Sequence, residues 1–279
     1  MFEKVKKRVQ SLTIFEIFIS ISIIVFTVFI VKFFGQKVES KIIRIEVINK
    51  SWGESWNPYG YRTPFWLSDK LKIGQKEYDK SGNVIAEIID IENYARGNEE
   101  AEIYLTVRVR TEYQKRLRQH FFKNIPLDLG SSIEIAPDQN IVYGQVIDNN
   151  VPPQGYLKKE FSIIARGRGY DQYVIDNIKI GERVENRHNG EAVATIVELH
   201  TEKTTQMYVS EITNYNDQGL SFRVDPNTQD IVVKLNMTAD QIDKRWYFAG
   251  HQQLKISNLV YFYGQNVDLI LEIESIEEL

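Results

Sequence analysis

The stretch GNVIAEIIDI at residues 82–91 has a near copy in GEAVATIVEL at residues 190–199. The two blocks align without a gap, and each places alanine fifth and isoleucine seventh. Both blocks are expected to form β-strands. Recurrence of a block in register is the sequence signature of an internal repeat, so the chain is predicted to contain two copies of one unit.

Further matches lie on both sides of these blocks. LKIGQ at 71–75 recurs as IKIGE at 178–182, and IYLTVRV at 103–109 recurs as IVVKLNM at 231–237. The distance in sequence between the 190–199 block and the 231–237 block is larger than that between the corresponding blocks of the first copy. This difference places one insertion at about Thr204–Pro226. The constant order of these matches predicts a duplicated domain.

Another pair of matches predicts where a helix begins. Thr111 and Thr238 each open a T-x-x-Q sequence, which ends at Gln114 and Gln241. A threonine followed three residues later by glutamine is the capping-box pattern of a helix N-terminus. We therefore expect one short helix in each copy, beginning at these threonines.

The remaining elements are predicted to be strands and turns. Residues 43–47 and 105–109 alternate between apolar and polar side chains, as half-buried strands do. A small closed barrel removes the exposed sheet edges that such strands would leave. The predicted fold class is mainly β, with an N-terminal transmembrane helix followed by two tandem small β-barrels, at 37–150 and 156–279, each with one short helix. Asn149–Gly155, which contains Pro-Pro, is the expected linker.

Turns are predicted at corresponding places in the two copies. Asp79–Asn83 and Asn186–Gly190 are rich in the turn formers Asp, Asn and Gly. Gly74 and Gly181 follow apolar residues at equivalent positions, which indicates either a tight turn or a site without room for a Cβ atom. Arg166–Tyr170 (RGRGY) is expected to be a turn that carries two cations rather than a phosphate-binding loop.

The N-terminal part carries an almost unbroken apolar run, Ile14–Phe34. As a helix it would be about 31 Å long, which matches a bilayer core of about 30 Å. No small-x-small cleavage site follows it, and basic residues crowd the tail before it, so an uncleaved signal anchor is expected. We predict a single-pass protein of the cell membrane with a cytoplasmic tail at 1–13, a transmembrane helix at 14–34 and an extracytoplasmic part beyond it.

Composition narrows the functional classes. Acidic residues outnumber basic ones by 38 to 34, which argues against nucleic-acid binding because that function needs a clustered cationic face. The absence of cysteine excludes disulfides, thiol catalysis and thiolate metal sites. The four histidines show no metal-binding spacing. We predict no metal site, no cofactor and no catalytic residue, and therefore not an enzyme.

The segment Trp52–Trp66 combines turn formers with a cluster of aromatic side chains. Trp and Tyr prefer membrane interfaces, and they also dominate the hot spots of protein–protein interfaces. Folding of the segment onto its own barrel would bury the rings instead. The candidate residues for a partner or membrane interface are Trp52, Trp56, Tyr59, Tyr61, Phe65 and Trp66.

The chain resembles a bacterial family of N-terminally membrane-anchored proteins that is catalogued as a domain of unknown function. The resemblance rests on the blocks that end at Gly74 and Gly181, the turn at Asp79–Asn83, and the strands that end at Ile91 and Leu199. It covers the apolar run and both copies, and it implies no catalytic residue.

More distantly, the order of these elements resembles that of mammalian-cell-entry (MCE) domains, which are envelope β-barrels that assemble into rings and carry lipids. The chain departs from their pattern by Ala86 and Ala194 in place of a glycine and by Glu77 in place of a valine. This resemblance implies a barrel topology.

Two functions from different classes follow from these patterns. The first is a non-catalytic, membrane-anchored envelope module that binds or scaffolds another envelope component. The alternative is a lipid-handling or transport-accessory protein that acts as an oligomeric ring. In both cases the partners are the membrane, through residues 14–34, and an envelope protein or lipid.

Overall fold

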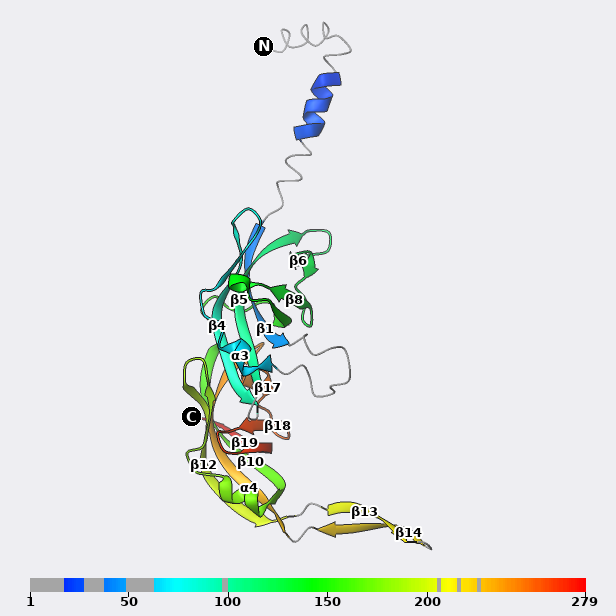
Figure 1. The fold of residues 1–279 in the computed structure, drawn as a ribbon, viewed down its shortest axis with the longest axis vertical. Helices are drawn as coiled ribbons and strands as arrows, with labels where there is room; N and C mark the ends of the chain where they lie inside the picture. The colour runs from blue at the N-terminus through cyan, green and yellow to red at the C-terminus, as the bar shows by residue number, and fades with distance from the viewer. Residues whose placement is uncertain are drawn as a thin grey trace. The chain divides into compact units, whose positions relative to one another are not determined.

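The computed structural model describes residues 18–27, 38–48, 63–96, 100–204, 207–214, 217–224 and 227–279. This part of the chain is mainly β, as predicted (Figure 1). One large antiparallel sheet contains 17 strands, and the helices are few and short. The chain divides into two compact units, one formed by residues 1–40 with 110–127 and the other by 41–109 with 128–279.

The elements fall into two series along the chain. The first series is β1 (Val38–Ile48), β2 (Thr63–Pro64), α3 (Phe65–Ser68), β3 (Lys76–Tyr78), β4 (Val84–Arg96), β5 (Glu100–Gln114), β6 (Gln119–Phe122), β7 (Ile125–Pro126), β8 (Ser132–Ile135), the 3-10 turn η1 (Pro137–Gln139) and β9 (Val142–Asp148). The second series is β10 (Leu157–Asp171), α4 (Gln172–Asn177), β11 (Arg183–Asn186), β12 (Glu191–Lys203), β13 (Met207–Asn214), β14 (Asp217–Val224), β15 (Thr228–Ile242), β16 (Arg245–Phe248), β17 (Gln252–Gln253), β18 (Leu259–Tyr263) and β19 (Asp268–Glu278).

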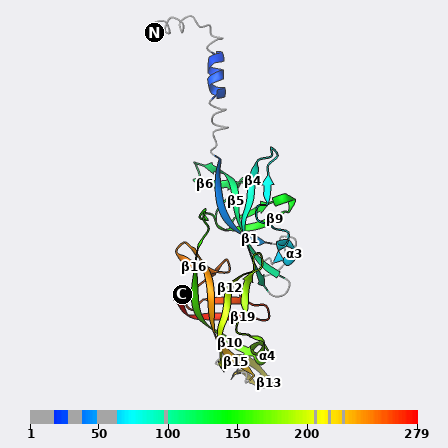
Figure 2. The same cartoon turned by 90° about the vertical axis from the view of Figure 1, so that its left-hand side faces the viewer.

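The two series have the same order of strand pairing. In the first, the neighbours run β3, β4, β5, β1, β9, β8. In the second they run β11, β12, β15, β10, β19, β18 (Figure 2). The register also corresponds, since Ala86 faces Val109 in β4–β5 and Ala194 faces Met237 in β12–β15. Matching sequence blocks therefore occupy matching strands.

A separate hairpin occupies the stretch where the second copy was expected to carry an insertion. Strands β13 and β14 pair along their whole length, from Met207 with Val224 to Asn214 with Asp217, and form a two-stranded sheet of their own. The hairpin lies between β12 and β15, whose counterparts β4 and β5 are joined by a short connection. The difference in spacing between the copies is thus a hairpin added to one strand connection.

The predicted barrel closure is not observed in the described part of the chain. The pairings among the 17 strands branch but never return to their starting strand. Instead, Asn186 of β11 pairs with Tyr94 of β4, and this pairing joins the two series into one sheet. Among the described residues no barrel closure is detected, and the strands of both copies belong to one sheet.

Glutamate side chains bond across the places where barrel closure would be needed. In the first series, the Glu77 carboxylate on β3 accepts a hydrogen bond from the Ala136 backbone N–H, just after β8, at 3.1 Å. In the second, the Glu182 carboxylate accepts from the Asn266 backbone N–H at 2.7 Å and from its side-chain amide at 2.8 Å. Each contact thus joins the two ends of its series through a glutamate side chain.

The helices predicted at the T-x-x-Q sequences were wrong. Thr111 and Thr238 lie within β5 and β15, and each strand turns directly into an antiparallel partner, β6 or β16. The Thr111 hydroxyl donates to the Glu39 carbonyl at 3.0 Å, so it does not cap a helix. The T-x-x-Q pattern alone does not distinguish a cap from the end of a strand, because tertiary pairing overrides weak local preference. The short helices are α3 and α4, elsewhere in each series.

The predicted turns are confirmed, and side chains fix them. The Asp79 carboxylate accepts hydrogen bonds from the backbone N–H groups of Ser81 and Asn83, at 2.8 and 2.9 Å. In the second series the Asn186 amide oxygen accepts from the His188 N–H at 3.1 Å. Asp and Asn favour turns because they bond to the backbone two residues further on.

The prediction of a turn at Arg166–Tyr170 was wrong, because the sequence lies within β10. The ladder to β15 shifts register between Gly167 and Tyr170. A Cβ atom on Gly167 would overlap the Tyr170 ring, so glycine is needed where the strand is distorted. Arg166 forms ion pairs with Glu274 of the adjacent strand β19 and with Glu202 of β12.

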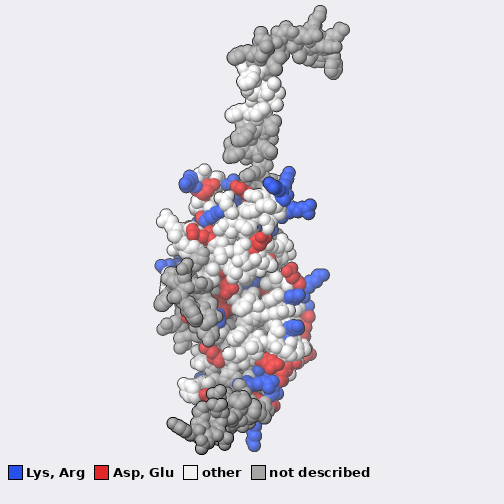
Figure 3. Space-filling view, turned by 90° about the vertical axis from the view of Figure 1, so that its right-hand side faces the viewer, with Lys and Arg blue, Asp and Glu red and all other residues white. Residues whose placement is uncertain are grey.

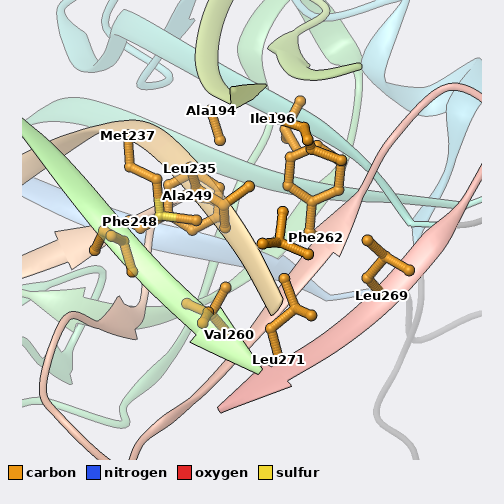
Figure 4. Close-up of a cluster of buried hydrophobic side chains, with 14 of the residues drawn as sticks. Ala194, Ile196, Leu235, Met237, Phe248, Ala249, Val260, Phe262, Leu269 and Leu271 are labelled. Carbon is orange, nitrogen blue, oxygen red and sulfur yellow. The ribbon is translucent and has the colours of Figure 1, made fainter. Parts of the chain in front are cut away.

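A hydrophobic core lies under β10, β12, β15 and β19 (Figure 4). It is built from apolar residues that alternate along these strands, so that every second side chain points inward. The fully buried members on β15 and β19 are Ile231, Val233, Leu235, Met237, Leu269, Leu271 and Ile273. The aromatic rings Phe248 and Phe262 pack against them.

Part of the predicted transmembrane helix is described. Residues 18–27 are helical, and all ten side chains are exposed, including Phe18, Ile24 and Phe26. The rest of 14–34 and the tail 1–13 lie outside the described residues. Within the ranges that the structure describes, no helix is long and apolar enough to cross a membrane.

The glycines at the corresponding turns have a testable role. Gly74 and Gly181 have φ angles of +87° and +90°, and a Cβ atom on either would meet no other atom within 4 Å. The requirement is therefore for backbone conformation rather than for space. We expect Gly74→Val and Gly181→Val each to lower the free energy of unfolding by about 1 kcal/mol or more. Gly74→Asn is the matched control, because asparagine tolerates this conformation. Urea unfolding of the full chain in detergent measures both, and an equal loss for valine and asparagine would contradict the argument.

Candidate functional site

Two of the six predicted interface residues lie in the described part of the chain. Trp52, Trp56, Tyr59 and Tyr61 lie outside it. Phe65 and Trp66 form the first turn of α3. The Trp66 side chain is 58% exposed, and the Lys70 ammonium group lies 4.9 Å from the centre of its ring. The structure therefore leaves Trp66 accessible instead of packing it into the core.

A short strand and a buried hydroxyl hold α3 in place. The Thr63 hydroxyl donates to the Val47 carbonyl of β1 at 3.1 Å, and β2 pairs with β5 just before the helix begins. Pro64 precedes the helix with extended backbone, where its missing N–H leaves no donor unsatisfied. These contacts fix the direction in which Phe65 leaves the sheet.

Phe65 contacts the second series directly. The Arg187 guanidinium lies over its ring, with 3.9 Å between the guanidinium carbon and the ring centre. The backbone N–H of Arg187 donates to the Asn93 carbonyl of β4 at 2.7 Å. This arginine is thus held at both its backbone and its side chain, although the side chain is exposed.

A cleft of about 470 Å³ opens beside this stacked pair. It is lined by α3, the end of β4, strand β11 and the turn between β18 and β19, so both series contribute to it. The aromatic walls are Phe65 and Tyr263, and the charged groups include Arg183, Arg187 and Asp268. Residues far apart in the sequence meet here because β11 pairs with β4.

The charges of the cleft are unevenly compensated. Arg183 pairs with Glu185, with 3.1 Å between Nε and Oε1. Arg187 makes no ion pair within the described ranges, so its charge faces the cleft without a carboxylate. Partial burial raises the pKa of Asp268 above its ordinary value. The cleft therefore offers a positioned guanidinium next to an aromatic surface, which suits a ligand that carries a carboxylate.

A buried charge network links the two series. Arg44 of β1 is fully buried, and its guanidinium lies 2.6 Å from the Glu92 carboxylate of β4 and 3.5 Å from the Asp240 carboxylate of β15. The rings of Tyr104 and Tyr156 lie 5.4 and 5.2 Å from the guanidinium carbon. Asp240 belongs to the second series, so this arginine joins the two series electrostatically.

One cation in this network faces two carboxylates. Burial raises the pKa of Glu92 and of Asp240, and the attraction of Arg44 offsets this effect only in part. The Tyr94 hydroxyl donates to Glu92 at 2.9 Å, which satisfies one further carboxylate lone pair. The carboxylates of Glu92 and Asp240 therefore take up a proton more readily than an exposed carboxylate does.

A second chain of polar contacts runs from Tyr104 toward the cleft. The Tyr104 hydroxyl lies 2.5 Å from His251 Nδ1 and 3.4 Å from Glu102, and Arg96 donates to Glu102 at 2.7 Å. Arg96 in turn lies over the ring of Tyr263, a wall of the cleft, at 5.9 Å. The packing of Tyr104 is close, because a Cβ atom on Gly250 would overlap its ring.

Several of these contacts could not be predicted from the sequence. Arg44 lies in an alternating strand, where a polar residue is expected to face solvent, yet Ile43, Arg44 and Ile45 are all fully buried. The second face is covered by another part of the chain, which a local pattern does not reveal. Arg187 lies in a predicted turn, and its stacking on Phe65 depends on the β4–β11 pairing.

The histidines are spread over the fold. Within the described ranges, no group of three or more His, Cys, Asp or Glu side chains could hold a metal ion. His251 contacts Tyr104, and His120 lies 3.1 Å from the Thr111 hydroxyl. Comparison with known proteins finds no family model, no curated protein and no solved structure that matches the chain.

The buried network predicts a pH-dependent difference between the wild type and Asp240→Asn. The pKa of Asp240 is raised in the folded state, so protonation stabilises the fold. This stabilisation is complete below the unfolded pKa of about 3.8 and is lost as pH rises through the folded pKa. We therefore expect the stability of Asp240→Asn relative to wild type to rise as the pH increases from about 4 to 7, on top of any constant cost of losing the Arg44 partner. The gain is roughly 1.4 kcal/mol for each pH unit that separates the folded pKa from the unfolded pKa.

Urea unfolding of both full-length proteins across this pH range measures the difference. Asp176→Asn is the matched control, because Asp176 is exposed and outside the network. A difference between wild type and Asp240→Asn that stays constant with pH would contradict the raised pKa.

Proposed function

We propose that the protein is a non-catalytic, membrane-anchored envelope module that binds another envelope component through the cleft at the junction of its two series. The observation that carries this proposal is Arg187, an exposed cation that is stacked on Phe65 and makes no ion pair within the described ranges. Arginine and aromatic side chains dominate protein–protein hot spots. A carboxylate side chain of the partner is the group that would pair with Arg187.

The organisation of the chain supports this role. In our proposal, residues 37–150 and 156–279 are two copies of one small β-domain, and the junction between them is a single binding surface. The recurring strand order and the buried Arg44 network support this division. Because Arg44 and the β4–β11 pairing join the two copies, the walls of the cleft keep their spacing when a partner approaches.

Membrane anchoring is also part of the proposal. Residues 14–34 form an apolar run of bilayer length, and the helical residues 18–27 expose their apolar side chains. We infer a single-pass arrangement in which the N-terminal tail is cytoplasmic and the β-domains lie outside. The cleft would then face components of the envelope.

Charge reversal in the cleft should weaken partner binding. We expect tagged full-length Arg187→Glu to capture much less of the partner from its own detergent-solubilised membranes than the tagged wild type does. A hot-spot loss of about 2 kcal/mol corresponds to roughly thirtyfold weaker affinity. Quantitative mass spectrometry of the captured proteins measures the change, and binding of the purified partner gives the affinity.

Arg245→Glu makes the same charge change at an exposed arginine outside the cleft, so it serves as the control. Phe65→Ala tests the stacking independently and should weaken binding without reversing a charge. Equal retention of partners by wild type, Arg187→Glu and Phe65→Ala would exclude the cleft as the binding surface.

The absence of native cysteine allows a direct test of topology. In Asn150→Cys, the new thiol lies at an exposed position in the connection between β9 and β10. We expect a membrane-impermeant maleimide to label it in intact cells, because the β-domains are outside. Labelling that requires cell lysis would place them in the cytoplasm.

A further inference from the structure

The turn between β5 and β6 is cationic and exposed. Between Gln114 and Gln119 the sequence is Lys-Arg-Leu-Arg, and the side chains of Lys115, Arg116 and Arg118 are exposed. Within the described ranges, none of these three cations has an ion pair. Leu117, which lies among them, is 53% exposed. The tip thus presents three cations and one apolar side chain in four consecutive residues.

The turn has a defined shape. The backbone N–H groups of Leu117 and Arg118 both donate to the Gln114 carbonyl, at 3.1 and 2.8 Å. Below the turn, Tyr113 pairs with His120, and their rings lie 4.9 Å apart. These contacts present the cations on an ordered hairpin instead of a loose loop.

The hairpin extends toward the N-terminal end of β1. The Thr111 hydroxyl donates to the Glu39 carbonyl at 3.0 Å, and β5 is antiparallel to β1, so residues after Thr111 continue past the start of β1. Strand geometry places Lys115 about 14 Å beyond Thr111. The end of the apolar run, Phe34, is five residues before Glu39 and can be at most about 18 Å from it. The covalent chain therefore limits the distance between the end of the apolar run and the tip to about 32 Å at most, the sum of these two lengths. In Figure 3, Lys and Arg side chains are spread over the visible face, with Asp and Glu side chains among them.

The second series lacks this feature, although it has the same hairpin. There β15 and β16 are joined by a two-residue turn, and Asp243 and Lys244 at its tip carry no net charge. The hairpin of the first series is longer, and all charges at its tip are positive. The strand topology alone does not require the cations, because the equivalent turn forms without them.

We propose that the β5–β6 tip docks on anionic phospholipid headgroups of the membrane that holds the anchor, with Leu117 entering the interface. The proposal rests on the membrane anchoring inferred above. Lys and Arg bind an anionic surface without needing a fixed partner, and an apolar side chain among them inserts at the headgroup boundary. A tip docked in this way would restrict the orientation of the β-domains relative to the membrane.

The full-length chain in vesicles provides the test. A single cysteine at Gln114→Cys, next to the tip, carries an environment-sensitive fluorophore and leaves the cations and Leu117 intact. We expect a blue-shifted emission in vesicles of phosphatidylcholine with phosphatidylglycerol, and little shift in phosphatidylcholine alone. Added salt should reverse the shift, because screening weakens attraction between exposed charges. The same fluorophore at Asp243→Cys, on the corresponding turn of the second series, should not respond to lipid charge.

Charge reversal separates the tip from general electrostatics. Lys115→Glu, Arg116→Glu and Arg118→Glu together should abolish the shift at position 114. Lys244→Glu, Arg245→Glu and Lys255→Glu make an equal charge change at exposed positions of the second series and should leave the shift unchanged. The proposal would be overturned if the emission were the same in both lipid mixtures. It would also be overturned if both triple variants lost the blue shift to the same extent.

Vesicle flotation distinguishes this failure from failure of the anchor. An anchored chain floats with vesicles of either composition, whatever the tip does. If the chain floats but the fluorophore shows no dependence on lipid charge, only the docking of the tip is wrong. If the chain does not float with phosphatidylcholine vesicles, the anchoring on which the proposed function depends is wrong as well.

Discussion

Complete burial of the Arg44 guanidinium is the constraint on which the rest of the structure depends. An isolated charge in a protein interior is very unfavourable, so it must be paired and hydrogen-bonded. Glu92 comes from the same series and Asp240 from the other, and both lie within ion-pair distance of the guanidinium. Removal of one partner from such a group typically costs about 3–5 kcal/mol, because the remaining charge stays buried. The position of one series relative to the other is therefore tied to a single β1 side chain.

The other contacts of the junction agree with this arrangement. The β4–β11 pairing makes the sheet continuous, and Gly250 allows the Tyr104 ring to approach closely enough to meet His251. The cleft is a result of the same geometry, since its walls come from α3 and β4 on one side and from β11 and the β18–β19 turn on the other. Neither series could form it alone. Arg187 acquires its position over Phe65 only when both are present, which connects the packing of the junction to the binding surface we propose.

Local patterns predicted those features that depend on local chemistry. The repeated blocks occupy corresponding strands because alternation of apolar residues determines which face of a strand is buried. The turns at Asp79 and Asn186 were predictable because each side chain bonds to its own backbone neighbours. Thr111 has the same sequence signature as a helix cap, but its hydroxyl bonds to β1, which is distant in the sequence. Barrel closure and the burial of Arg44 also depend on which distant segment covers a strand, and that information is not present in a window of neighbouring residues.

The contact between Arg44 and Asp240 also affects the order in which the chain can fold during synthesis. Asp240 is synthesised nearly two hundred residues after its partner, and a domain normally begins to fold as it emerges during synthesis. Until the last third of the chain has been made, the first series exposes a guanidinium, the Tyr104 ring and the apolar surface around them. The guanidinium of Arg44 is fully covered only after the segment of the second series that carries Asp240 has been made.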